Sequence, residues 1–134
     1  MKCRTSAVKR LCVWLGCLLV VCPVLSRNFI HPGVLHTKER MKQIRALVKE
    51  KNEDAYASYL LLEKHPCAQA DYKMEGPFDT ISRDGKFAYT KSKMERDFSA
   101  VYLNALMWGI TGNEAHARKS AEVLAAYARV LKRI

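Results

Sequence analysis

Cationic and aromatic side chains gather in a part of the chain that shows little helical periodicity. Arg83, Lys86, Tyr89 and Lys93 follow one another closely there, and Tyr102 comes later, within a helical pattern. Cations can pair with the acidic groups of a ligand, and an aromatic ring offers a flat apolar face. We therefore predict that these five residues bind a polyanion. The alternatives are a solvated basic loop for the first four and a core position for Tyr102.

The other reactive residue types form no catalytic or metal-binding pattern. The chain has four histidines, His31, His36, His65 and His116. They share no spacing and no accompanying acidic pattern, so we expect no metal and no cofactor. Cys67 has no base placed near it by the sequence, which makes a plain thiol the simpler interpretation. Asp97 could orient a neighbouring side chain or lie exposed in the first turn of a helix.

Residues 1–26 have the three-part layout of a secretory signal peptide. Basic residues come first, an apolar run extends from Leu11 to Leu25, and Val24 and Ser26 are small residues suited to a cleavage site. As a helix the apolar run would span about 22 Å, short of the roughly 30 Å core of a bilayer, which argues against a membrane anchor. A lipoprotein signal at Cys17 is a further alternative. We predict a secreted or periplasmic protein with no stable membrane span after cleavage.

The composition indicates one basic globular domain. The chain has 134 residues, a formal net charge of +10 and 49% hydrophobic residues, which excludes a disordered or collagen-like chain. Only Cys67 lies outside the leader, so the mature chain, residues 27–134, cannot form an intrachain disulfide. Basic charge alone could favour nucleic acid, but an exported chain rarely meets it, so we expect no nucleic-acid partner.

Two helices are predicted in the first half of the mature chain. The first begins at an N-cap, Thr37, and fades near Lys51–Asn52, and its outer face is basic. The second extends from Asp54 to Lys64 and ends because Pro66 disfavours helical backbone at the residue before it. Pro66–Ser92 then lacks clear periodicity, and a loop of this length suggests a lid, a binding loop or a missed element.

A short hairpin at Asp84–Gly85 is the missed element that the sequence favours most. The third helix is predicted over Glu95–Thr111, and its broad apolar face should be largely buried. Gly112 and Asn113 suit a tight corner into the fourth helix, Glu114–Ile134. We expect an apolar stripe of the fourth helix to be buried. That stripe consists of Ala117, Ala121, Leu124, Ala128 and Leu131, with Val123 and Tyr127 beside it.

The fourth helix has no Gly or Pro to stop it. The third helix also presents more apolar surface than one partner helix would cover. We therefore expect an all-α fold in which this chain is the N-terminal piece of a longer protein.

The stretch Ala105–Glu114 reads ALMWGITGNE. It resembles a helical hairpin of the alginate lyase family, polysaccharide lyases with an α/α-toroid fold. The segment Phe29–Thr37, with its His-Pro-Gly-hydrophobic turn, is similar to the start of the same domain. Lys93, Asp97 and Tyr102 fall where bacterial members of that group carry similar residues.

The resemblance spans about residues 28–134 and implies the opening helical hairpins of an incomplete α/α toroid. It implies β-elimination of an anionic, uronate-containing polysaccharide such as alginate. That reaction needs a group to neutralise the C6 carboxylate, a base for the C5 proton and an acid for the O4 leaving group. In the family these groups lie largely on later helices, so no catalytic residue is carried over and the chain alone is expected to be inactive. The alternative is a non-enzymatic helical-repeat interaction module.

Overall fold

The computed structural model describes residues 36–134, so the expected signal peptide and the His-Pro-Gly turn lie outside the described residues. Four α-helices carry the fold of this part, with two short 3-10 turns between them. They are α2 (Lys38–Lys49), α3 (Glu53–Lys64), η1 (Pro66–Ala68), η2 (Gly85–Phe87), α4 (Tyr89–Thr111) and α5 (Glu114–Val130). Over this range the chain has no β-strand, which confirms the all-α expectation, and none of these helices is long and apolar enough to cross a membrane.

Local capping chemistry fixes several helix boundaries where the sequence predicts them. The Thr37 hydroxyl accepts a hydrogen bond from a backbone N–H in the first turn of α2, and α3 ends just before Pro66. Gly112 adopts φ 75°, the left-handed conformation that closes α4, and the Asn113 side chain caps α5. The α4–α5 corner is therefore confirmed.

The start of α4 differs from the sequence prediction. The helix begins at Tyr89, two turns before Glu95, and the proposed hairpin at Asp84–Gly85 is wrong, because Gly85–Phe87 forms a 3-10 turn that leads into the helix. No side chain caps this end of α4. The Thr90 hydroxyl instead donates to the carbonyl of Phe87 at 2.7 Å and accepts from the backbone N–H of Ser82 at 3.2 Å.

The end of α5 also differs, because the predicted helix to Ile134 stops at Val130. The last residues turn back to an extended segment that precedes η2. The backbone N–H of Ile81 donates to the carbonyl of Arg133 at 3.0 Å, and the N–H of Lys132 donates to the carbonyl of Asp79 at 2.9 Å. Long-range backbone hydrogen bonds thus end a helix that no local signal ends.

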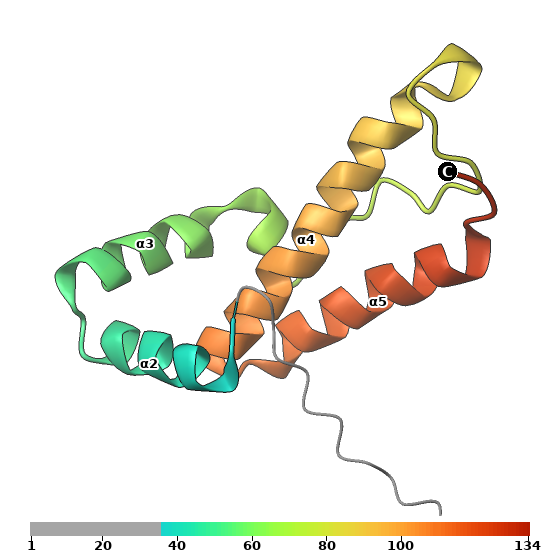
Figure 1. The fold of residues 1–134 in the computed structure, drawn as a ribbon. Helices are drawn as coiled ribbons and strands as arrows, with labels where there is room; N and C mark the ends of the chain where they lie inside the picture. Colours follow the sequence, from blue (N-terminus) through green and yellow to red (C-terminus); the bar gives the residue numbers. More distant parts are fainter. Residues whose placement is uncertain (1–35) are drawn as a thin grey trace, which may run out of the picture. The chain divides into compact units, whose positions relative to one another are not determined.

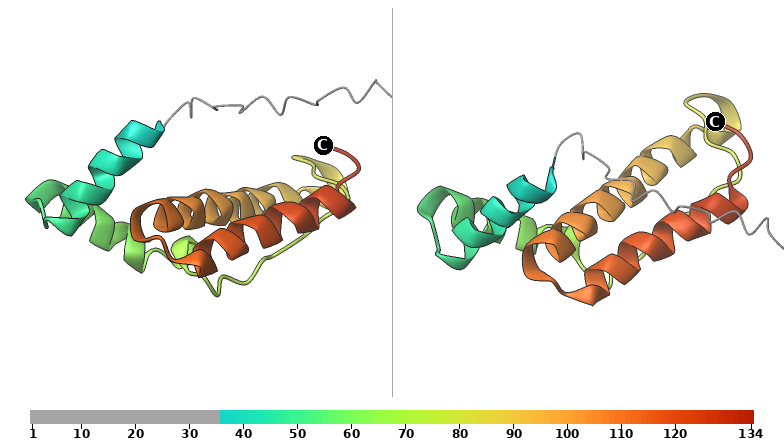
Figure 2. Two further views of the ribbon diagram at one scale, coloured as in Figure 1. Left: turned by 90° about the horizontal axis from the view of Figure 1, so that it is seen from below. Right: turned by 60° about the horizontal axis from the view of Figure 1, so that its bottom comes forward.

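The helices pack around α4 (Figure 1). α5 lies beside it as the second arm of a hairpin, while α2 and α3 contact it as a separate helix pair. The chain between η1 and η2 runs back along the α4–α5 hairpin (Figure 2). Ile81, Val123 and Tyr127 form the core of this arrangement. Around them pack partly buried side chains of Met74, Phe78, Met94, Val101 and Leu131.

The side of α4 that faces the core is unexpectedly polar. Thr90, Asp97 and Asn104, each seven residues from the next, are at most 1% exposed. A spacing of seven places side chains on one helix face. Thr90 holds the Ser82 segment, and the Asn104 amide donates to the carbonyls of Ala100 and Cys67 at 3.0 and 2.9 Å. We call these three residues the polar stripe of α4.

Asp97 is the centre of the polar stripe. Its carboxylate accepts hydrogen bonds from the hydroxyls of Tyr72 and Tyr127 at 2.9 and 2.8 Å, and from the backbone N–H groups of Glu75 and Gly76, both at 2.9 Å. Burial, together with the hydrogen bond to Asp97, raises the pKa of both tyrosine hydroxyls above the ordinary value. The expectation of an exposed first-turn carboxylate is wrong, since Asp97 lies more than two turns inside α4 and joins the loop to both long helices.

The buried face of α5 is likewise displaced from the predicted apolar stripe. Its buried residues are His116, Ser120, Val123 and Tyr127, whereas Leu124 remains 46% exposed. The polar members have partners: His116 Nδ1 lies 2.7 Å from the Asn104 side-chain oxygen, and the Ser120 hydroxyl donates to a carbonyl of α4. Satisfied hydrogen bonds make these side chains compatible with burial. The buried face therefore includes Val123 and Tyr127, which the prediction placed beside the stripe, and not the stripe residue Leu124.

Candidate functional site

A groove runs along the middle and C-terminal turns of α4. It consists of three adjoining hollows of about 590, 530 and 250 Å³. The first two share His65, Glu95 and Ser99, and the second and third share Tyr102. From Glu95 to Gly109 they follow about 21 Å of helix at 1.5 Å per residue. We call this surface the α4 groove, and its length suits a chain-like ligand better than a small molecule.

Aromatic rings line the α4 groove and remain partly open to solvent. Phe98, Tyr102 and Trp108 are 37%, 43% and 45% exposed. The prediction that the broad apolar face of this helix is largely buried is therefore wrong, because the helix buries its polar stripe in place of these rings. The Phe98 ring packs partly against Tyr127, with ring centroids 5.2 Å apart, so its orientation is set by the core beneath it.

The first hollow is polar and carries a compact ion cluster. Glu75 lies in it, with its carboxylate oxygens 3.1 Å from Arg96 and 3.7 Å from Lys93. The Glu75 backbone N–H is one of the donors to Asp97, so the buried carboxylate also positions this ion cluster. Both cations share the single negative charge of Glu75, so each is only partly compensated.

The third hollow is apolar and lies where α2 crosses α4. Met41 covers Gly109, and the Nε of Arg45 donates to the Gly109 carbonyl at 2.9 Å. His36 Nε2 lies 2.9 Å from the Tyr102 hydroxyl, and the two rings stack with centroids 6.2 Å apart. The packing of the Met41 side chain over a glycine and the Arg45 hydrogen bond therefore hold the basic helix α2 against the aromatic residues of α4.

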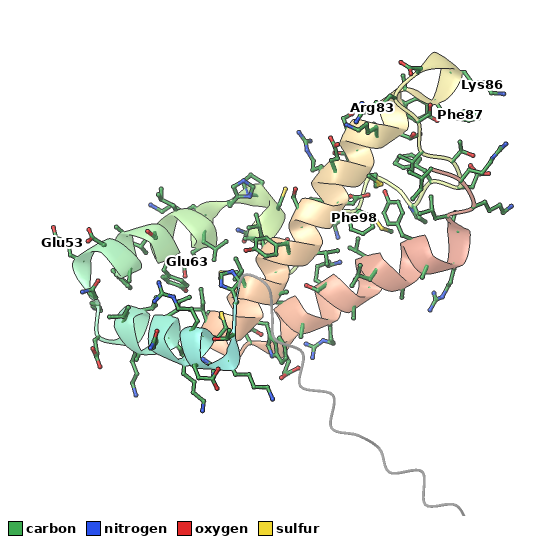
Figure 3. The ribbon with its side chains drawn as sticks, in the orientation of Figure 1. Glu53, Glu63, Arg83, Lys86, Phe87 and Phe98 are labelled. Carbon is green, nitrogen blue, oxygen red and sulfur yellow. The ribbon has the colours of Figure 1, made fainter. Side chains whose placement is uncertain are left out.

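The structure divides the five residues predicted from the sequence between two places. Arg83, Lys86, Tyr89 and Lys93 gather at the η2 end of α4, whereas Tyr102 lies in the α4 groove. Along the helix, Tyr89 and Tyr102 are separated by about 20 Å. Figure 3 shows Arg83 and Lys86 at the η2 end and Phe98 beside the middle of α4.

Several side chains at the η2 end already have partners in the protein. The Lys86 ammonium sits 4.9 Å from the centre of the Phe87 ring, and the Tyr89 ring makes an edge contact with Phe78 at 5.9 Å. Lys93 shares Glu75 with Arg96. Arg83 is exposed and lines a separate hollow of about 320 Å³. These four residues lie in one region, but only Arg83 has neither an ion pair nor an aromatic partner among residues 36–134.

The buried histidine and cysteine belong to the fold. The Asn104 amide nitrogen donates to two carbonyls, so its oxygen is the acceptor and His116 Nδ1 carries the hydrogen. Cys67 is buried with a free thiol. No group of three or more His, Cys, Asp or Glu side chains in residues 36–134 is arranged to hold a metal ion.

Sequence reasoning missed the part of the site that α2 contributes. The sequence predicts a basic outer face for the first helix, but it contains no signal that places Lys38, Lys42 and Arg45 beside Tyr102 and Trp108. The missing information was the contact of Met41 with Gly109.

The chain matches no protein-family model, no curated protein and no solved structure.

Proposed function

We propose that this chain is the substrate-binding helical part of an exported polysaccharide lyase that acts on uronate-containing, alginate-like polysaccharide by β-elimination. The observation that carries the proposal is the α4 groove, in which Tyr102 and Trp108 lie beside a basic helix. Aromatic faces pack on the C–H faces of sugar rings, and cations pair with carboxylates. The resemblance of Ala105–Glu114 and Phe29–Thr37 to alginate lyases supports the same substrate class.

Binding is the part of the reaction that these residues can perform. An exposed cation beside a uronate carboxylate holds the sugar and offsets some of its charge, which favours loss of the C5 proton. The base for that proton and the acid for the O4 leaving group are assigned to no residue of this chain. The proposal accordingly gives the helical hairpins the task of orienting the polymer, within an α/α-toroid architecture and a periplasmic or extracellular setting.

The test is a binding titration of the purified chain with an oligomannuronate, with the neutral oligomannose of equal linkage and length as a comparison. We expect saturable binding of the oligomannuronate, weaker binding of the neutral sugar, and no rise in the ultraviolet absorbance of unsaturated uronate. Absence of binding to any uronate oligosaccharide would refute the proposed function. Robust turnover would refute the assignment of the chemistry to groups elsewhere.

A second candidate is a non-enzymatic helical-repeat module that binds a protein. The observation in its favour is the exposed apolar surface, since Leu61 is 75% exposed in addition to the aromatic rings of the α4 groove. Against it, the two helix pairs are unlike each other: α2 and α3 have 12 residues each, whereas α4 and α5 have 23 and 17. Stacked repeats reuse one unit. Capture of a defined protein partner, together with no uronate binding, would favour this candidate.

A further inference from the structure

The third hollow of the α4 groove continues onto α2. A further hollow of about 330 Å³ shares His36 and Met41 with it and is lined by Lys38, Lys42 and Arg45. Rings and cations therefore open onto one continuous surface, the aromatic part supplied by α4 and the basic part by α2. We call the three cations the basic edge of the groove.

The basic edge is set apart by its place beside the aromatic hollow. Within residues 36–134, ion pairs engage Lys91, Lys93, Arg96 and Lys119, and Lys38 and Lys42 are among the cations that form none. Arg45 is engaged by the Gly109 carbonyl, which fixes α2 in place. The nearby carboxylates are Glu39 on α2, which is exposed, and Glu114, which accepts from the Trp108 indole N–H at 3.3 Å. Two lysines thus face a groove with their charges uncompensated.

We infer that the basic edge binds the carboxylates of a uronate oligosaccharide whose sugar rings lie on Tyr102 and Trp108. This inference rests on the proposed function and names the place on the molecule where the anionic chain binds. Charge complementarity favours this occupant, because each uronate residue carries one carboxylate and the basic edge offers cations on one side of the rings only. It also transfers the binding role from the η2 end, where Lys86 lies against Phe87 and Lys93 pairs with Glu75, to the crossing of α2 and α4.

The test measures the affinity of the full chain for the oligomannuronate after removal of two charges at a time. Lys38→Gln with Lys42→Gln should weaken binding by about tenfold, since exposed charge pairs contribute roughly 0.5–1 kcal/mol each. Binding of the neutral oligomannose should not change. Lys49→Gln with Arg129→Gln removes the same charge from exposed positions outside the groove, and we expect less than about a twofold effect. Trp108→Ala should weaken binding of both sugars, because stacking does not depend on the carboxylates.

Three results would overturn the inference. If Arg83→Gln with Lys86→Gln weakens oligomannuronate binding and the α2 pair does not, the η2 end is the binding surface and the proposed function still stands. If all three charge-removing pairs weaken binding equally, the attraction is general and the basic edge is not a site. If the unmodified chain binds no uronate oligosaccharide, the proposed function fails together with the inference.

Discussion

The buried and the groove-lining residues of α4 reverse the usual distribution of polar and apolar side chains. The buried set includes a carboxylate, an amide and a hydroxyl, all at most 1% exposed, whereas the groove-lining set includes three aromatic rings that are 37–45% exposed. Burial of polar groups is tolerated only when every group has a partner, and Asp97 alone has four. The difference teaches that hydrogen bonding rather than hydropathy decides how this helix is oriented, and that the exposed rings are left available for a ligand.

Removal of the Asp97 carboxylate should produce the largest effect on the buried side. Asp97→Ala leaves two tyrosine hydroxyls and two backbone N–H groups without their acceptor, so we expect a loss of roughly 3–5 kcal/mol in the free energy of unfolding. Denaturant unfolding measures this loss. Asp84→Asn, at an exposed position whose side chain makes no capping bond, should change the free energy by less than about 0.5 kcal/mol. Equal losses in the two variants would contradict the central role of Asp97.

A methyl group added at Gly76 tests the same side through packing. A Cβ there would lie 2.8 Å from Cζ of the buried Tyr127 ring, so Gly76→Ala should destabilise the fold by about 1–3 kcal/mol. Gly109→Ala is the counterpart on the groove side, where the added Cβ meets the flexible end of Met41 at 2.6 Å. Met41 can move and alanine favours the helix, so we expect a change within about 0.5 kcal/mol. Thermal unfolding of both variants decides between these outcomes.

Alkaline pH should weaken the buried side selectively. The folded chain raises the pKa of Tyr72 and Tyr127 above the value of 10.0 expected when unfolded. The protonated hydroxyls therefore stabilise the folded state fully below about pH 10, and this contribution is lost as the pH rises further. Unfolding measured from pH 8 to 11 should show falling stability.

The double variant Tyr72→Phe with Tyr127→Phe isolates this contribution from the deprotonation of lysines. Its stability should fall less steeply above about pH 10 than that of the parent chain. Identical slopes would show that the two hydroxyls do not bind their protons more tightly in the folded state.

The smallest effect is expected on the groove side. Tyr102→Phe removes the contact with His36, 2.9 Å away at an exposed position, and should lower the free energy of unfolding by about 0.5 kcal/mol. Tyr59→Phe is a matched control, because the Tyr59 hydroxyl donates to Glu63 on the surface of α3, a bond that raises its pKa to about 12. A loss at Tyr102 as large as that at Asp97 would show that the groove ring is part of the core.

The sequence predicts those features of the fold that local chemistry controls. Thr37, Pro66, Gly112 and Asn113 act within a turn of their own position, so their effects on helix ends can be read directly. The all-α class and the α4–α5 hairpin follow from them. The start of α4 at Tyr89 could not be read in this way, because a 3-10 turn leads into the helix and no side chain caps its first turn.

The features that were missed depend on contacts between distant segments. α5 ends where the backbones of Lys132 and Arg133 form hydrogen bonds with Asp79 and Ile81. No residue type near Val130 predicts this helix end. The sequence does contain polar residues that recur every seven positions, at Thr90, Asp97 and Asn104. Hydropathy assigns polar side chains to the surface, so it predicts a buried apolar face for α4 where the structure has the partly exposed rings of the α4 groove.

The sequence predicts the residue types of the candidate site better than their positions in the fold. Cations and rings suited to a polyanion were identified, and Tyr102 lies in the α4 groove. The basic edge on α2 required the contact of Met41 with Gly109, which joins residues far apart in the sequence. That contact can be known only once the helices are packed.

Hydrogen bonds are directional, and this property of the polar stripe has a consequence for recognition. A helix held only by apolar contacts can rotate or shift slightly along its axis. Hydrogen bonds at Thr90, Asp97 and Asn104 instead fix the rotation of α4 about its axis. The rings that line the α4 groove are therefore preorganised before a ligand arrives. The protein then loses little conformational entropy on association, so even a solvent-exposed surface can bind a flexible polymer.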